Sequence, residues 1–244
     1  MSSHTVDLHQ DPHGDPHGHG EHDPHHQHHF ATMEQQFDTA KLGMWIFLVT
    51  EVLTFGGLFA GFGLMQSRYP QEFLEAHEHL IRWQGTLNTV VLLVSSFTMV
   101  KAVAAVRRNM NQVAVRYLIA TIVCAFIFMG VKYFEYTHKF EEGLFPGKWY
   151  QSQPTDTVKV VDVITNKIIP SPGYKTFFSF YFMMTGLHGL HIVVGIGLLT
   201  WVAIRTSRGE LNSSYYTPVD LVGLFWHLVD LVWIYLFPLY YLIS

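Results

Sequence analysis

Residues 174–204 read YKTFFSFYFMMTGLHGLHIVVGIGLLTWVAI, and this stretch decides the fold. Its formally charged side chain, Lys175, stands at the start, and the remaining residues are apolar, small or weakly polar. At ~1.5 Å per residue, a helix of this length exceeds the ~30 Å hydrocarbon layer of a bilayer. A chain in lipid must satisfy its backbone N–H and C=O groups internally, and a continuous apolar run does so as a helix. The stretch therefore predicts a membrane-spanning helix.

Four further apolar segments are long enough to cross the membrane, at approximately 42–65, 86–106, 114–137 and 219–243. With the stretch above they predict an all-α, polytopic membrane protein, in which residues 34–244 form a bundle of five transmembrane helices. The composition agrees, because 14% of the residues are charged, whereas soluble domains have about 25%. No long basic run follows a phosphate backbone, which excludes nucleic acid as a partner.

Residues 1–33 differ sharply from the rest and hold ten of the sixteen histidines, with a repeated DPHGDPHG. Glycine, proline and charge deny this segment a core, so it is predicted to be a disordered, His-rich cytoplasmic tail. Metal capture by its exposed imidazoles is the alternative. The segment lacks the apolar centre of a signal peptide, and membrane insertion is expected to begin at the first span.

The orientation follows from lysine and arginine in the short connections. Two of these connections carry basic residues and are therefore expected to be cytoplasmic. The link 107–116 has Arg107, Arg108 and Arg116, and the link after the fourth span has Arg205 and Arg208. This places the N-terminus inside and Ser244 outside, with an outer loop over 138–173. Within that loop, TVKVVDVITNKI (157–168) is expected to form a short hairpin, in a segment that is either a surface flap or a contact for a partner subunit.

Several ionisable side chains interrupt the predicted spans, at a cost of ~2.5 kcal/mol or more each at the membrane centre. They are Glu51, Lys132, Glu135, His188, His191, His227 and Asp230. Counting residues from the cytoplasmic ends places Glu51, His191 and Asp230 within roughly 5 Å of one another in depth. Glu135 is expected near the outer face. A contact between Asp230 and His191, or between Glu51 and His188, is therefore predicted.

Four roles are open for these groups. Haem ligation needs facing imidazoles at one level, and His227 is displaced from His191 in depth. A di-metal carboxylate site needs Glu-x-x-His motifs, which the intramembrane acids lack. A proton relay is the third role, and polar helix–helix or lipid-headgroup contacts are the fourth. We expect no catalytic residue and no metal ligand, and a structural or proton-related polar cluster of Glu51, His188, His191, His227 and Asp230.

Four stretches in order resemble subunit III of the haem–copper terminal oxidases, typified by cytochrome c oxidase subunit III. They are LGMWIFLVTEVLTFGG (42–57), GVKYFEYTHKFEEGLFPG (130–147), FFSFYFMMTGLHGLHIVVG (177–195) and GLFWHLVDLVWIYLF (223–237). The resemblance covers roughly residues 40–244. The common form of that subunit has seven helices, so this chain resembles a five-helix form whose lipid cleft another chain would complete.

The resemblance implies a subunit that supports oxygen reduction and coupled proton pumping in a bacterial inner membrane. It implies haem and copper in the partner subunits I and II, none in this chain, and bound phospholipid. Other respiratory complexes are further candidate partners. The family's functional positions match Glu51, Glu135, His188, His191, Arg205, His227 and Asp230, of which Glu51, His191 and Arg205 are the candidate lipid contacts.

Other functions stay open beside this one. Subunit III of a quinol oxidase and an accessory subunit of a nitric oxide reductase are the alternatives within the resemblance, and cytochrome c is the expected electron donor. A stand-alone proton-coupled transporter would show internal repeats and interrupted helices, which the five spans lack. A membrane-embedded haem enzyme is disfavoured by the depth of the histidines.

Overall fold

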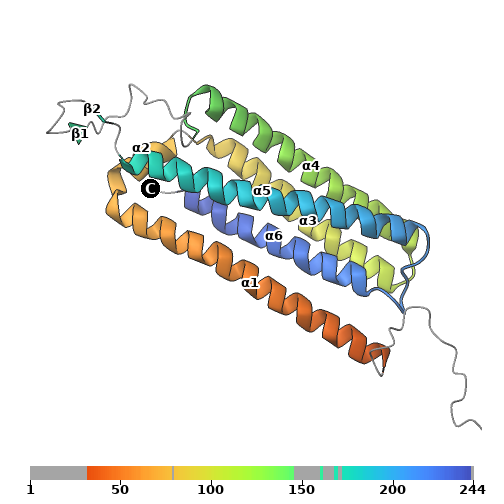
Figure 1. Ribbon diagram of the computed structural model, residues 1–244. Coiled ribbons are helices and arrows are strands. Elements are labelled where there is room, and N and C mark those ends of the chain that lie inside the picture. Colours follow the sequence, from red (N-terminus) through yellow and green to blue (C-terminus); the bar gives the residue numbers. More distant parts are fainter. Residues whose placement is uncertain (1–31, 79, 146–159, 162–167, 170–171, 243–244) are drawn as a thin grey trace, which may run out of the picture. The chain divides into compact units, whose positions relative to one another are not determined.

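The computed structural model describes residues 32–78, 80–145, 160–161, 168–169 and 172–242. The chain divides into two compact units, Met1–Ala40 and Lys41–Ser244, and the second contains nearly all of the helical bundle (Figure 1). Within the described residues five helices are long and apolar enough to cross a membrane: α1 (Met33–Arg68), α3 (Arg82–Arg107), α4 (Asn111–Glu141), α5 (Pro172–Ser207) and α6 (Thr217–Tyr241). The predicted all-α, five-span architecture is therefore confirmed.

The helices extend beyond the apolar segments from which they were predicted. α4 continues to Glu141 and α5 begins at Pro172, so helix occupies both ends of the segment 138–173 that was predicted as a loop. An apolar run marks only the part of a helix that lies in hydrocarbon, whereas the hydrogen-bonded backbone continues into the polar interface. The predicted tail falls almost entirely on residues 1–31, which lie outside the described residues.

A short helix that the sequence analysis did not predict, α2 (Pro70–Glu78), follows α1. It packs on α5, where the ring of Phe73 lies 5.4 Å from that of Phe177, and the same ring lies 5.1 Å from that of Phe62 on α1. Proline at the first position suits a helix start because its φ is already helical and its missing N–H is not needed. At nine residues α2 is too short to span lipid, and so the length criterion passed over it.

Two short strands, β1 (Val160–Val161) and β2 (Ile168–Ile169), lie between α4 and α5. They pair antiparallel, with Val160 opposite Ile169 and Val161 opposite Ile168. The short hairpin predicted within 157–168 is confirmed at these residues. Its second strand ends at Ile169, one residue beyond the predicted range. Residues 162–167 lie outside the described residues.

Tight connections and small residues hold the spans together. α3 and α4 are joined by a turn in which Asn109 has φ 57°, and its side-chain Oδ1 accepts a 2.7 Å hydrogen bond from Ser213 N in the connection between α5 and α6. Asparagine adopts this left-handed conformation more readily than most residues. α5 and α6 approach closely at Gly195, where a Cβ atom would lie 2.7 Å from Cζ3 of Trp226.

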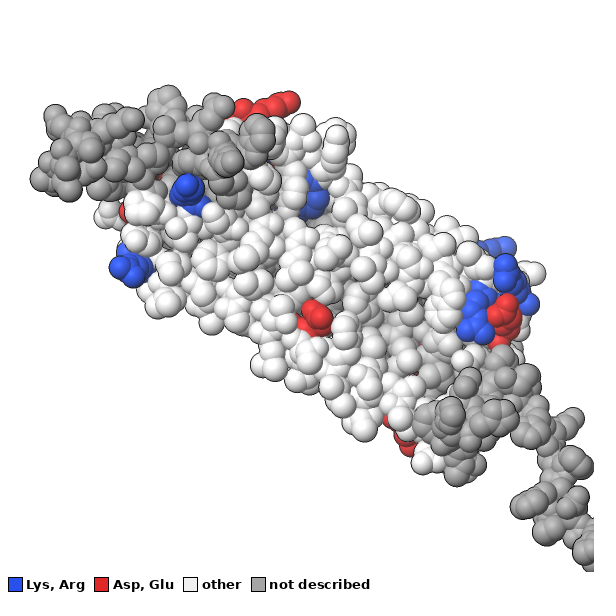
Figure 2. All heavy atoms as spheres, viewed as in Figure 1, with Lys and Arg blue, Asp and Glu red and all other residues white. Residues whose placement is uncertain are grey.

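α1 is the least covered of the spans. Only 11% of its most apolar 18-residue stretch is buried, whereas 50% of the corresponding stretch of α6 is buried. Large apolar side chains along α1 are exposed, including Leu42, Trp45, Ile46, Val49, Val52, Leu53 and Leu64. On the face of Lys41–Ser244 seen in Figure 2, charged atoms gather mainly at the two ends and uncharged atoms dominate between them. Such a surface suits contact with lipid or with a partner chain.

Candidate functional site

The clearest polar contact between spans joins α1 to α5. His191 Nε2 lies 3.0 Å from Glu51 Oε2, and His191 Nδ1 lies 2.8 Å from the carbonyl oxygen of Leu187. A carbonyl only accepts, so Nδ1 donates to it. The Glu51–His191 contact then needs one proton, carried by either the imidazole or the carboxyl group. In both cases the pair has no net charge, which suits a site in hydrocarbon.

His188 lies one turn earlier on α5 but serves a different interface. Its ring stacks on Trp233 of α6, with centroids 5.4 Å apart and an interplanar angle of 30°. The ring of Phe128, on α4, meets it edge-on at 5.6 Å. His188 is 1% exposed, and neither ring nitrogen has a hydrogen-bond partner among the described residues. The predicted pairing of Glu51 with His188 is wrong, because the rotation of α5 turns His191 toward α1.

α4 contributes a buried ion pair with hydroxyl partners on α5 and α6. Lys132 Nζ lies 2.8 Å from Glu135 Oε2. Tyr181 and Tyr241 donate to Glu135 Oε1 over 2.7 and 2.5 Å, and the same hydroxyl oxygens accept from Lys132 Nζ at 3.3 and 3.0 Å. We call these four residues the Lys132–Glu135 cluster.

The sequence alone did not reveal this cluster. Glu135 was expected at a depth near the outer membrane face, and it lies toward the end of α4, bonded to Tyr241 at the end of α6. It is also 1% exposed, which depth did not predict. The signal that could have revealed the pair is the spacing of Lys132 and Glu135, because residues three apart on a helix are neighbours. The tyrosines could not be assigned without knowing which helices adjoin α4.

The polar pair of α6 faces α3. His227 Nδ1 lies 2.8 Å from Ser96 Oγ. Asp230 is 4% exposed, and its carboxyl group lies within reach of the hydroxyls of Ser95 and Ser96 on α3. Within the described residues, His191 is bonded to Leu187 and Glu51 and Asp230 lies at Ser95 and Ser96, so the two predicted partners belong to different interfaces of the bundle.

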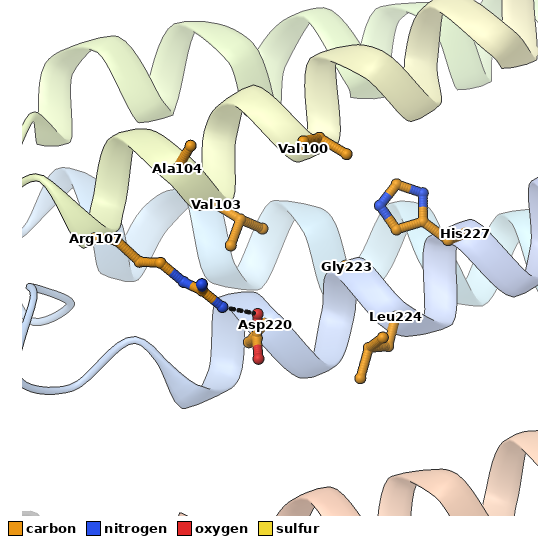
Figure 3. A pocket seen from close by; sticks show the side chains of 8 residues that line it. All are labelled: Val100, Val103, Ala104, Arg107, Asp220, Gly223, Leu224 and His227. Atoms are coloured by element: carbon orange, nitrogen blue, oxygen red, sulfur yellow. Dashed lines mark hydrogen bonds and ion pairs between the residues drawn. The ribbon is translucent and has the colours of Figure 1, made fainter.

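A groove of about 280 Å³ runs between α3 and α6 and is shown in Figure 3. His227 lines one end, and Arg107 and Asp220 line the other, where Arg107 Nη2 lies 2.7 Å from Asp220 Oδ1. Lys41 Nζ is 3.7 Å from Asp220 Oδ2. Asp220 thus ties α6 to both α1 and α3 at the end of the bundle, a role that the sequence did not reveal.

Arg205, the remaining predicted site residue, lies at the end of α5. Its Nε donates to Glu210 Oε2 over 2.7 Å, and its guanidinium carbon is 5.2 Å from the ring centroid of Trp201. Both contacts are local in sequence. Among the described residues, no three side chains of His, Cys, Asp or Glu come together in an arrangement that could hold a metal ion.

The site residues therefore form three separate sets rather than a single cluster. Glu51 and His191 join α1 to α5; the Lys132–Glu135 cluster and His188 join α4 to α5 and α6; and His227 and Asp230 face α3. Each set lies where two or three spans meet, which is how polar groups in membrane helices stabilise packing. Depth along the helices had placed Glu51, His191 and Asp230 together, but the rotation of the helices brings only Glu51 and His191 into contact and turns Asp230 toward α3.

Comparison with known proteins agrees with this architecture. Residues 171–244 match the family model described as Cytochrome c oxidase subunit III. The chain is 30% identical over 222 residues to Quinol oxidase subunit 3 of Bacillus spizizenii, covering 88% of this chain and 93% of the relative. It is 29% identical over 210 residues to Cytochrome c oxidase subunit 3 of Thermostichus vulcanus, covering 85% and 89%.

A further relative, Heme-copper oxidase subunit I+III of Aeropyrum pernix, is 26% identical over 217 residues, which cover 84% of this chain and 23% of the relative. The similarity to the separate subunits extends over nearly the full length of both chains and includes the spans that carry the polar residues. This chain therefore belongs to the subunit III family of the haem–copper oxidases.

Proposed function

We propose that this chain is a non-catalytic third subunit that stabilises subunit I during oxygen reduction and coupled proton pumping and maintains proton uptake. In this proposal haem and copper are bound by subunits I and II, and the chain itself carries no redox centre. The complex lies in a bacterial inner membrane, with the N-terminus of this chain cytoplasmic. Cytochrome c is the proposed electron donor. Quinol is the alternative, because relatives of nearly equal identity bear both names.

The proposal is carried by the bonding and burial of the three histidine side chains in the spans. His191 is bonded to Glu51 and Leu187, and His227 is bonded to Ser96. His188 has free nitrogens but is enclosed by aromatic rings and 1% exposed. A haem or metal ligand needs a nitrogen lone pair that faces an open coordination site. The arrangement favours helix packing over ligation.

The uncovered face of α1 supports contacts with phospholipid and with subunit I. The Glu51 and His191 side chains are 19% and 16% exposed, so the pair lies at the edge of this face. A pair without net charge costs less to place beside acyl chains than a lone charge does, whereas Arg205 lies at the end of a span, where a lipid phosphate would be. We therefore assign Glu51, His191 and Arg205 as lipid contacts.

Purification of the complex through a tag on this chain tests the proposal. We expect subunits I and II to copurify with the haem. When His191→Leu is purified instead through a tag on subunit I, we expect less of this chain to be retained while the haem spectrum of that preparation is unchanged. Leu190→Val, at a neighbouring exposed position, is the control and should retain the chain normally. Loss of a haem band in His191→Leu, or a lone chain with stoichiometric haem, would contradict the proposal. Oxidation of reduced cytochrome c or of quinol by the same preparation identifies the donor.

Lipid binding is tested separately by counting the phospholipids that remain after detergent washing. We expect Arg205→Gln to retain fewer phospholipids than the unmodified complex. Arg208→Gln is the matched control, because the Arg208 side chain is 69% exposed and its Nη1 lies 3.9 Å from Glu210, at the limit of an ion pair. Equal lipid retention in both variants would remove Arg205 from the proposed site without affecting the assignment of the subunit.

A further inference from the structure

Two grooves lie on the surface of the bundle, one on each side of α6. The first, of about 280 Å³, lies between α3 and α6 and is drawn in Figure 3. The second, of about 330 Å³, lies between α1 and α6. Leu224 and His227 line both grooves, so the two adjoin along this helix. Both are open rather than enclosed, and a ligand can therefore enter them from the surrounding membrane.

The walls of both grooves are almost entirely apolar. Between Arg107 at one end and His227 at the other, the first groove is lined by Val100, Val103, Ala104, Gly223 and Leu224. The second is lined by apolar side chains of α1 between Trp45 and Leu53, and by leucines of α6 around His227. Hydrocarbon chains of lipid are as apolar as such side chains, so both grooves suit an acyl chain.

Two cations share one carboxylate at the end of these grooves. Arg107 Nη2 lies 2.7 Å from Asp220 Oδ1, and Lys41 Nζ lies 3.7 Å from Asp220 Oδ2, so the formal charges of the three side chains add up to a single positive charge. The guanidinium of Arg107 lies 4.8 Å from the ring centroid of Tyr216, which fixes its place. Its side chain is 48% exposed, and it has further N–H donors beyond the one bonded to Asp220. An anion can therefore bind beside Asp220.

Both grooves run from this charged end toward the middle of the membrane. The first extends from Arg107 to Val100, which at ~1.5 Å per residue is about 10 Å along α3. The second begins at Trp45, one turn after Lys41, and extends to Leu53. One positively charged end thus serves two apolar grooves. A partner helix, ~10 Å across, would lie over both grooves rather than enter each of them, whereas a phospholipid has one anionic headgroup and two separate chains.

We propose that a phospholipid with an anionic headgroup binds astride α6, with its phosphate at Arg107 and Lys41 and one acyl chain in each groove on either side of Leu224. The lipid joins α3, α6 and α1 at the end where α1 is otherwise little covered. Arg205 lines neither groove, so this site is distinct from the lipid contacts proposed above. The inference requires only that the chain spans a membrane, and it does not depend on the electron donor or on the partner subunits.

Photocrosslinking in the complete complex tests the headgroup contact. The complex is purified through a tag on subunit I and placed in lipid nanodiscs that contain phosphatidylglycerol with a photoactivatable acyl chain. Cross-links per retained copy of this chain are then mapped by mass spectrometry, and we expect them within 45–53, 100–104 and 224–231. Arg107→Gln should lower their yield on the order of tenfold, because a charge-assisted hydrogen bond is lost. Arg108→Gln is the matched control, because Arg108 is exposed and lines neither groove, and its yield should change less than about twofold.

A second variant tests the acyl-chain contact without changing any charge. Ala104→Leu narrows the first groove and should lower the cross-links at 100–104, whereas Val123→Leu, at a 49% exposed position of α4 outside both grooves, should not. Arg205→Gln should also leave these cross-links unchanged, which separates this site from the proposed contact at Arg205. Equal yields for Arg107→Gln and Arg108→Gln, an equal yield with a phosphatidylcholine probe, or a partner helix over both grooves in a cryo-electron microscopy map would overturn the proposal.

Discussion

Replacing Glu135 by glutamine removes the carboxylate charge that lies 2.8 Å from Lys132 in the core of the bundle. Glutamine has nearly the same volume, and its amide oxygen can still accept from Tyr181 and Tyr241. The variant therefore isolates the electrostatic part of the cluster. It leaves the ammonium group of Lys132, whose side chain is 8% exposed, without a counter-charge.

The expected loss follows from the surroundings of Lys132. Removing one partner of a buried ion pair costs about 3–5 kcal/mol. The rings of Tyr181, Trp233 and Tyr241 lie 5.3, 4.8 and 5.5 Å from Lys132 Nζ and still attract the cation. We therefore expect the lower end, about 3 kcal/mol, which is roughly a hundredfold change in the unfolding equilibrium. The double variant Lys132→Met with Glu135→Gln removes both charges and should recover to within about 1 kcal/mol of the unmodified chain.

The assay is detergent-induced unfolding of the purified complex, followed by the helicity of this chain and its release from the other subunits. Glu210→Gln is the control, because the Glu210 side chain is 37% exposed and its partners Arg205 and Arg208 are 23% and 69% exposed. Its expected effect is about 0–1 kcal/mol. Equal effects of Glu135→Gln and Glu210→Gln, or a double variant as unstable as the single one, would refute the reasoning.

Three further predictions concern packing and surface charge. Gly195→Ala should destabilise the chain by about 1–3 kcal/mol in the same assay, because the added methyl group meets Trp226, whereas Gly197→Ala, with no atom within 4 Å of its Cβ, should be neutral. Trp233→Phe should cost about 1 kcal/mol or more through loss of the hydrogen bond to Thr89, and a neutral result would show that this bond is not stabilising. Asp220→Asn should change stability by less than about 1 kcal/mol at physiological salt, because its partners Arg107 and Lys41 are 48% and 36% exposed. A larger loss would mean that these ion pairs are more buried in the complex.

The sequence by itself determined the number and kind of the spans. A run such as 174–204 has one stable solution in lipid, because its backbone must be hydrogen-bonded internally and its length is sufficient to cross the hydrocarbon layer. The motifs around Glu51, His188 and Asp230 also indicated the family correctly. The short helix α2 escaped prediction because its stability comes from packing on α5 rather than from its length.

The tertiary structure alone decided which polar side chains meet. Counting residues gave the depth of Glu51, His191 and Asp230, but a contact also requires adjacent helices and a suitable rotation of each about its axis. α5 turns His191 toward Glu51 and His188 toward Trp233, and α4 brings Glu135 into the core with Lys132. An apolar sequence is nearly the same on every face of such helices, so hydrophobic periodicity cannot set that rotation. It is fixed instead by close-packed contacts such as Gly195 against Trp226, which form only when the helices are assembled.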